Sequence, residues 1–404
     1  MSKYDYAKLR YLNVQPTNHE GHPLIFLNDP LELSPHYALV PPQFGIVLAT
    51  CDGEHTISDM QRETIAYTGI LLSETDINYI LAELDKVFFL DNERFAQEQI
   101  NIVNKYRSAP SRPPTHVGVT YPADPNELCK YFQKFVDRVS PVEELETGNG
   151  LFSPHIDYSR GGEVYAEVWQ RARKLVREAE CIIVFGTDHY GILFGQITPT
   201  RQSYATPFGV LPTEQTVVDA IVAAIGEKTA FEEELNHRHE HSIELALNWL
   251  HFMRDGEPCP IVPILCGSFS HFILEGNSPA KDKRFQNVVN AIKEATTGRK
   301  ILTVASGDLA HIGPAFHGEH VSLAEKMKLK EIDEAMLKPV LQGDSDGFFE
   351  FIRHEEDKRN VCGTAPLYLA MKLMGDVPGQ MAGYDRCVAD EKGQSFVSVC
   401  GLTF

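Results

Sequence analysis

The segment Cys181-Ile-Ile-Val-Phe-Gly-Thr-Asp-His-Tyr-Gly191 decides the fold class that we predict for this chain. It opens with a run of apolar, mostly β-branched residues, which is typical of a strand buried in a parallel sheet. A glycine and then an Asp-His pair follow the run. Because open α/β sheets bind their ligands beyond the carboxyl ends of such strands, we expect His189 to lie at a functional site.

Other apolar runs and helical patterns alternate with this strand through the second part of the chain. Strands are predicted at residues 150–153, 260–265, 300–305 and 395–400, and helices at residues 165–178, 235–252, 285–295, 323–341 and 366–374. Strands that alternate with helices indicate an α/β fold, here a three-layer sandwich with a largely parallel sheet.

Residues 1–107 are predicted to form a separate N-terminal domain that is small and mainly helical. Its helices are expected near Phe44, over residues 57–67 and from Ser73, with a strand at residues 87–90. This order suggests a winged-helix shape, although a helical appendage of the main domain explains it equally well. The proline-rich residues 108–115 are predicted to be a linker, so that the second domain covers residues 116–404.

The composition excludes several classes of function. The chain has 37 basic and 56 acidic residues and a net charge of −19, which repels phosphate backbones and argues against nucleic-acid binding. No apolar run approaches the roughly 20 residues that span a bilayer, so no membrane partner is expected. The first residues lack the apolar core of a signal peptide, and we therefore expect a cytoplasmic protein. The eight cysteines contain no Cys-x-x-Cys pair, which argues against a disulfide framework.

Histidines collect at the predicted strand ends. His155, His189 and His311 each follow a strand, and the ends of parallel strands meet at one edge of a sheet. Glu240 and His241 open a predicted helix, and Cys362 precedes another. Each of these residues alone is more typical of a structural role. Together they indicate a transition-metal site, because imidazole and thiolate bind such ions and three ligands leave a coordination position open.

These segments occur in the order of the Memo family, also known as AmmeMemoRadiSam system protein B, which residues 112–404 resemble. The resemblance rests on an opening, five motifs and an ending: His116-Val-Gly-Val-Thr-Tyr-Pro, Pro-His-x-x-Tyr (154–158), Gly-x-x-His (186–189), Glu-His-Ser-Ile-Glu (240–244), Ser-x-Asp-x-x-His (306–311), Cys-Gly (362–363), and Tyr384 with residues 395–401. In residues 1–107, Cys51-Asp-Gly followed by residues 56–59 resembles PqqD-like domains, which bind peptides and work beside radical-SAM enzymes.

The Memo family shares its fold with LigB-type class III extradiol dioxygenases, whose iron is held by two histidines and a glutamate. The resemblance implies that His155 and His189 are metal ligands and that Cys362 is the third. A thiolate in place of a carboxylate favours copper or zinc and weakens the case for dioxygenase activity. We expect one transition-metal ion, with iron or copper favoured and zinc possible. It also implies that His311 is the acid/base residue, positioned by Asp308.

The resemblance further implies that His241 and Glu240 line the mouth of the site. Two departures from the family pattern, Tyr190 after the second ligand and Ile156-Asp157 in place of an Ala-Gly pair, change what fits the pocket but remove no ligand. No Gly-x-Gly-x-x-Gly, P-loop or Gly-x-Ser-x-Gly motif is present.

Three functions follow. The first is a metal-dependent redox enzyme that acts on a small molecule or protein. The second is metal-assisted hydrolysis on the same ligands. The third is a scaffold that binds a peptide, with the N-terminal domain recruiting a radical-SAM partner protein.

Overall fold

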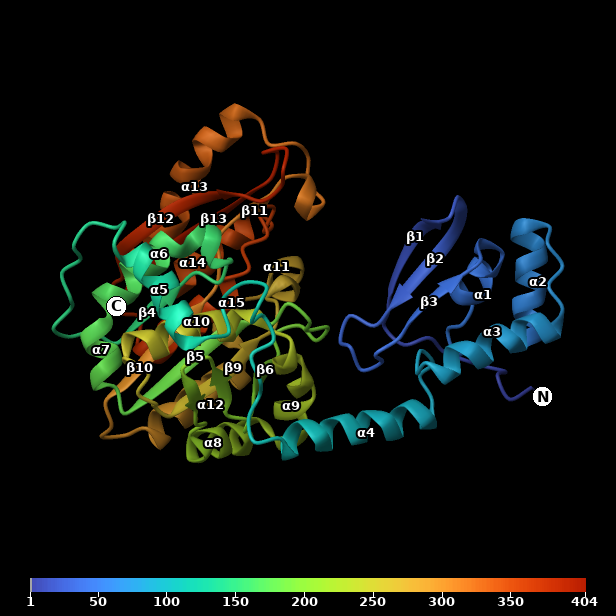
Figure 1. The fold of residues 1–404 in the computed structure, drawn as a ribbon, viewed down its shortest axis with the longest axis horizontal. Helices are drawn as coiled ribbons and strands as arrows, with labels where there is room; N and C mark the ends of the chain where they lie inside the picture. Colours follow the sequence, from blue (N-terminus) through green and yellow to red (C-terminus); the bar gives the residue numbers. More distant parts are fainter. Residues whose placement is uncertain (1) are drawn as a thin grey trace. The chain divides into compact units, whose positions relative to one another are not determined.

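In the computed structural model, which describes residues 2–404, the apolar run at the start of the quoted segment forms the central strand β5 (Cys181–Thr187), and all seven of its residues are buried. It lies in a row of four parallel strands in the order β4 (Gly150–Ser153), β10 (Ile301–Ser306), β5 and β9 (Ile261–Cys266). The mixed α/β fold with a mostly parallel central sheet is therefore confirmed (Figure 1).

Antiparallel strands extend this row on both sides. The short β6 (Ile197–Pro199) pairs with β9, and β13 (Phe396–Thr403) pairs with β4. β13 in turn pairs with β12 (Gln380–Val388) and β11 (His311–Ile312). The last predicted strand thus exists but runs antiparallel, and the hairpin partner β12 was not predicted because its residues are half-exposed and lack a continuous apolar run.

Alternate residues of β5 face two separate layers of helices. Ile182 and Val184 pack with α5 (Pro125–Val136), α6 (Tyr158–Arg171), α7 (Arg173–Glu178) and α10 (His241–Met253). Ile183 and Phe185 pack with helices on the other face, namely α8 (Gln215–Ile225), α12 (Lys283–Ala295), α13 (Leu323–Leu341), α14 (Ser345–His354) and α15 (Thr364–Met374). The sandwich therefore has three layers.

The helix α10 lies directly against β5. A Cβ atom at Gly186 would stand 2.5 Å from Ile243 Cγ1 and 2.7 Å from Ser242 Oγ, so only glycine permits this approach. Eleven of the thirteen residues of α10 are buried. The remaining short elements of this part of the chain are α9 (Glu227–Phe231), α11 (Ser270–Glu275), β7 (Tyr204–Thr206), β8 (Gly209–Leu211), η2 (Glu234–Arg238), η3 (Pro279–Lys281) and η4 (Pro314–Phe316).

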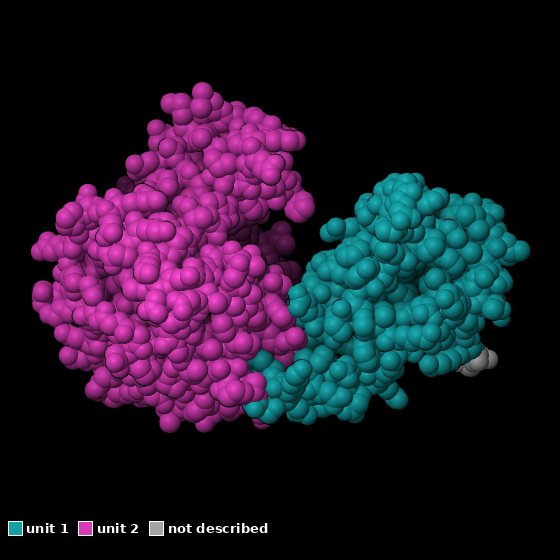
Figure 2. Space-filling model, in the orientation of Figure 1, with its two compact units in different colours: residues 1–108 teal, residues 109–404 magenta. Residues whose placement is uncertain are grey.

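The chain divides into a unit that ends at Ser108 and a second unit, Ala109–Phe404, coloured separately in Figure 2. The proline-rich segment predicted to be a linker belongs to the second unit. Arg112 within it is fully buried, its N–H donates to the Ser203 carbonyl, and its carbonyl accepts the N–H of Ala205. The prolines that suggested a linker are themselves exposed or half-buried, but Arg112 between them anchors the segment in the core.

The first unit contains a sheet that the sequence reading missed. The strands β1 (Asn13–His19), β2 (His22–Asn28) and β3 (Tyr37–Val40) form an antiparallel sheet in this order. Helices follow at η1 (Pro42–Phe44), α1 (Gly45–Ala49), α2 (Ile57–Thr68), α3 (Glu74–Lys86) and α4 (Glu93–Ser108).

The helices α2 and α3 begin as predicted, each with a capping box. Residues 87–90 form no strand and contribute only an isolated bridge between Leu90 and Leu9. The winged-helix shape remains a prediction. Over residues 2–404, no helix combines the length and the apolarity needed to cross a membrane.

A buried ion pair joins the start of the second unit to α10. The Arg112 guanidinium contacts the Glu244 carboxylate, and both side chains are at most 1% exposed. Glu244 also accepts N–H groups from Thr115 at 3.0 Å and His116 at 2.9 Å. Burial acts to raise the pKa of Glu244, but hydrogen bonding from His116 and the charge of Arg112 outweigh it and hold this pKa well below its usual range.

We predict that Arg112→Met lowers the free energy of unfolding by about 3–5 kcal/mol in urea titrations at pH 7, because it leaves a buried carboxylate without its cation. The double variant Arg112→Met/Glu244→Gln should recover part of the loss, since glutamine keeps an acceptor for the two N–H groups. Glu244 has a lowered folded pKa, so its contribution is present at neutral pH and is lost as the pH falls below about 4.3. Lys174→Met, which removes an exposed ion pair with Glu146, serves as the control and should leave the midpoint unchanged.

Candidate metal centre

Three neighbouring parallel strands bring the predicted residues to one edge of the sheet. His155 follows β4 by two residues, Asp308 follows β10 by two, and His189 follows β5 by two. Because β10 lies between β4 and β5, these side chains come from adjacent strand ends. His241 is the first residue of α10.

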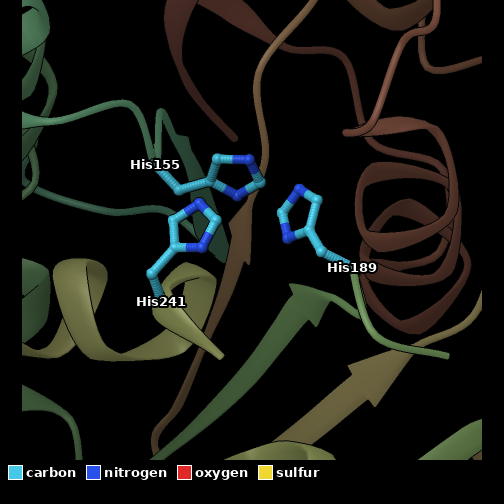
Figure 3. A group of neighbouring side chains, drawn as sticks. All are labelled: His155, His189 and His241. Carbon is cyan, nitrogen blue, oxygen red and sulfur yellow. The ribbon is translucent and has the colours of Figure 1, made fainter. Parts of the chain in front are cut away.

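His155, His189 and His241 form a cluster that could hold a metal ion. One nitrogen of each ring lies within 4.8 Å of one nitrogen of each other ring. The ring centroids are 4.7–4.9 Å apart, and the rings face a common space (Figure 3). From the sequence we expected His241 to line the mouth of the site. In the structure its ring is part of the three-histidine cluster itself.

Glu240 orients two of these rings. Its carboxylate is fully buried, lies 3.0 Å from His189 Nδ1 and 3.2 Å from His241 Nδ1, and also accepts the N–H groups of His189 and Ser242. A carboxylate on Nδ1 fixes the proton there and leaves the Nε2 lone pair for a metal. Burial acts to raise the pKa of Glu240, but His189 and His241 outweigh it and hold this pKa well below its usual range.

The protonation of the cluster suits metal binding. Burial lowers the pKa of His155 well below its usual value and that of His241 to about 4, so both rings are neutral at pH 7. The Nδ1 atom of His155 is buried and has no hydrogen-bond partner in the structure. His189 differs, because Glu240 and Cys362 overcome the effect of burial and raise its pKa, so a metal would have to displace a proton there. An orphaned buried nitrogen beside two more imidazoles fits a transition-metal ion.

Cys362 lies against this cluster. Its Sγ atom is 3.1 Å from His155 Nε2 and accepts the N–H of Asp308 at 3.2 Å. A Cβ atom at Gly307 would stand 2.4 Å from Gly363 Cα, so two facing glycines allow the cysteine loop to approach the end of β10. Burial raises the pKa of the Cys362 thiol, against the effect of His189. The structure therefore brings the three predicted ligands together and adds His241.

Asp308 and His311 do not pair as the sequence reading expected. Asp308 Oδ1 accepts the N–H groups of His155 at 2.9 Å and Ile156 at 3.3 Å, and Oδ2 lies 3.8 Å from His155 Nε2. Burial raises its pKa to about 7 against these hydrogen bonds. His311 Nδ1 instead lies 3.1 Å from the Leu309 carbonyl and 3.0 Å from the Asn360 carbonyl. Asp308 thus positions the first histidine, and main-chain carbonyls position His311.

A cavity of about 1030 Å³ opens onto these residues. Its wall includes side chains that the sequence reading did not select, namely His116, Thr120, Arg160, Leu245, Phe316 and His317. Arg160 lies five residues after His155, and this short spacing is a sequence signal that could have identified it. No local pattern distinguishes His317 from other histidines in loops. His311 has a pKa lowered to about 4 by burial and by His189, so it is neutral at pH 7.

The fold and the histidine cluster define an α/β protein with a candidate metal site at the carboxyl ends of its parallel strands. The chain belongs to the Memo family, because the family model of Memo-like proteins matches residues 112–401. It is 22% identical to a MEMO1 family protein of Aquifex aeolicus, with 98% of this chain and 99% of that protein aligned. It is 25% identical to a MEMO1 family protein of Nitrosopumilus maritimus, over 68% of this chain and 91% of that protein. Identity to the memo-1 homolog of Caenorhabditis elegans is 23%, over 65% and 71%.

We predict that Glu240→Gln weakens metal binding about 10- to 100-fold, because an amide oxygen accepts the Nδ1 proton of His189 more weakly than a carboxylate does and does not offset its charge. The measurement is competition with a chelator of known affinity, using copper and zinc in turn. Glu232→Gln removes an exposed carboxylate of the same charge and serves as the control. Equal affinities for both variants and the wild type would refute the positioning role of Glu240.

Proposed function

We propose that this protein binds one transition-metal ion at His155, His189 and His241 and uses it in a redox reaction on a small molecule or peptide that enters the cavity. The observation that carries this proposal is the orphaned Nδ1 of His155, buried beside two further imidazoles that share one carboxylate. Two neutral rings, a third whose proton a metal can displace, and an open side toward the cavity fit a catalytic ion rather than a closed structural one.

The donor set bears on the choice of metal. Three imidazoles suit zinc, copper and iron alike, and the soft, oxidisable thiol of Cys362 beside them adds support for copper. When bound, such an ion supplies single-electron chemistry toward dioxygen or an oxygenated substrate. Cys362 lies within reach of the ligand rings and adds a sulfur donor that can be oxidised.

His311 is placed to move a proton during this reaction. Its Nδ1 faces two carbonyls and therefore carries the proton, which leaves Nε2 as the base. A pKa of about 4 keeps this ring in the base form at neutral pH. His311 lines the same cavity as the three-histidine cluster, so a ligand in the cavity can contact both.

Zinc-assisted hydrolysis is the second candidate, and one observation favours it. Three histidines with an open position are the ligand set of zinc enzymes that activate water, whereas the set expected from the sequence contained two histidines and a thiolate. Both candidates use the same residues. They are distinguished by the metal that supports turnover.

We predict that the full chain purified without oxygen holds one transition-metal ion, and that His155→Ala, His189→Ala and His241→Ala each lower metal occupancy at least tenfold. His317→Ala, which removes a cavity histidine outside the cluster, should retain the ion. Metal content is measured by mass spectrometry, and circular dichroism reports whether each variant is folded. Full occupancy in a folded His241→Ala variant would show that this ring is not a ligand. Cys362→Ser should keep zinc but weaken copper binding.

We predict that His311→Gln lowers turnover by about 10²- to 10⁴-fold while metal occupancy stays unchanged, because a neutral amide cannot accept a proton. Oxygen consumption with ascorbate is measured for the copper- and iron-loaded protein, and ester hydrolysis for the zinc-loaded protein. His317→Ala should be active at the wild-type rate. Unchanged turnover in His311→Gln would remove its acid/base role, and activity confined to the zinc-loaded protein would favour hydrolysis.

A further inference from the structure

A second group of buried polar side chains lies next to His189 in the sequence and plays no part in the proposed function. Asp188 precedes His189, and Glu233 precedes the short helix η2 (Glu234–Arg238). The exposed fractions of these two residues are only 7% and 8%. Two acidic side chains that are more than nine-tenths buried require compensation by hydrogen bonds or by a cation.

Hydrogen bonds satisfy only some of the carboxylate oxygens of Asp188 and Glu233. Asp188 accepts from Asn236 Nδ2 at 2.9 Å and from the N–H of Tyr190 at 3.1 Å. Glu233 Oε1 accepts the N–H groups of Ile192 at 2.8 Å and Leu193 at 3.1 Å. Glu233 Oε2 is buried and has no hydrogen-bond partner in the structure. Over residues 2–404, no ion pair that the structure shows involves either carboxylate.

The two carboxylates both lie against Gly191. The point that a Cβ atom would occupy at Gly191 lies 3.0 Å from Asp188 Oδ2 and 3.4 Å from Glu233 Oε2, and these are the nearest oxygens to it. Both oxygens lie near the same glycine. Calcium takes oxygen ligands at about 2.3–2.6 Å and magnesium at about 2.0–2.1 Å, so a movement of either carboxylate toward the other lets one ion contact both. A side chain at residue 191 would press against Asp188, so glycine is what leaves room for the two carboxylates there. The unpartnered Oε2 therefore lies close to a second buried carboxylate, where a cation can offset both charges.

We propose that Asp188 and Glu233 bind a divalent cation of the hard, oxygen-preferring class, Ca²⁺ or Mg²⁺, and that this cation fixes the loop that carries His189. Carboxylate oxygens select such ions, whereas the imidazoles of the neighbouring cluster select transition metals. The two sites are therefore chemically distinct. This inference does not depend on the proposed redox function.

The test is calorimetric titration of the full chain, stripped of metal by chelation, with CaCl₂ and in a second arm with MgCl₂ at pH 7.5. We expect one ion per chain in at least one arm and a rise in melting temperature of roughly 3–8 °C at about 100 times the Kd. Glu233→Gln and Asp188→Asn should each weaken binding at least tenfold and abolish the thermal shift. Glutamine and asparagine keep the acceptors for the N–H groups, so both variants are expected to fold.

Two controls separate this site from its surroundings. His241→Ala should bind the cation as the wild type does, because imidazole does not select Ca²⁺ or Mg²⁺. Glu232→Gln, at the exposed neighbouring position, should also leave the titration unchanged. Failure of the wild type to bind either ion at millimolar concentration overturns the proposal, as does equal binding by a folded Glu233→Gln variant.

Discussion

The buried contact between Arg112 and Glu244 is the constraint on which the candidate site depends. The Arg112 guanidinium also donates from Nε to the His237 carbonyl at 2.8 Å and from Nη2 to the Glu240 carbonyl at 2.9 Å. One side chain therefore fixes both η2 and the first turn of α10. Glu240 is the N-cap of that helix, and its carboxylate orients the rings of His189 and His241. Through these bonds, a residue with no place in the cavity determines where two of the three imidazoles lie.

The electrostatics of the site follow from this arrangement. Burial favours neutral imidazole, and it does so for His155, His241 and His311. His189 departs from this pattern because the ionised Glu240 lies against its Nδ1. A single buried carboxylate thus balances one cationic ring in the absence of metal, and it orients the same ring for a metal ion.

The sequence predicted those parts of the fold whose signals are local. β5 was predicted because a strand that is buried along its whole length has an apolar run in its sequence. The helices α2 and α3 were predicted because a capping box marks the first turn of each. The sheet β1–β3 was missed because six of the seven residues of β1 are exposed, so no alternation of apolar and polar residues marks it. Arg112 was missed for a different reason, since prolines around it imitate a linker while its partner Glu244 lies 132 residues away.

The distinction between local sequence signals and contacts between distant residues applies to the site as well. His155, His189 and Cys362 could be selected from motifs, because each follows a strand or precedes a helix. The place of His241 depends on how closely α10 approaches β5, which Gly186 sets and which no residue count reveals. The pairing of Asp308 with the N–H groups at the end of β4 depends in the same way on the register of β10 against β4.

The wall of the cavity contains the two residues at which we expect this chain to depart from the Memo family pattern. Ile156 and Asp157 stand where the family resemblance implied a small Ala-Gly pair. Asp157 caps α6 and contacts Arg160 Nε at 2.5 Å, and Arg160 Nη1 reaches the Val388 carbonyl at 3.4 Å. This charged pair lies in the cavity wall beside His155, while Ile156 adds an apolar surface. Because Asp157 and Arg160 line the same cavity as the three histidines, the size and charge of these side chains bear on which ligands fit there.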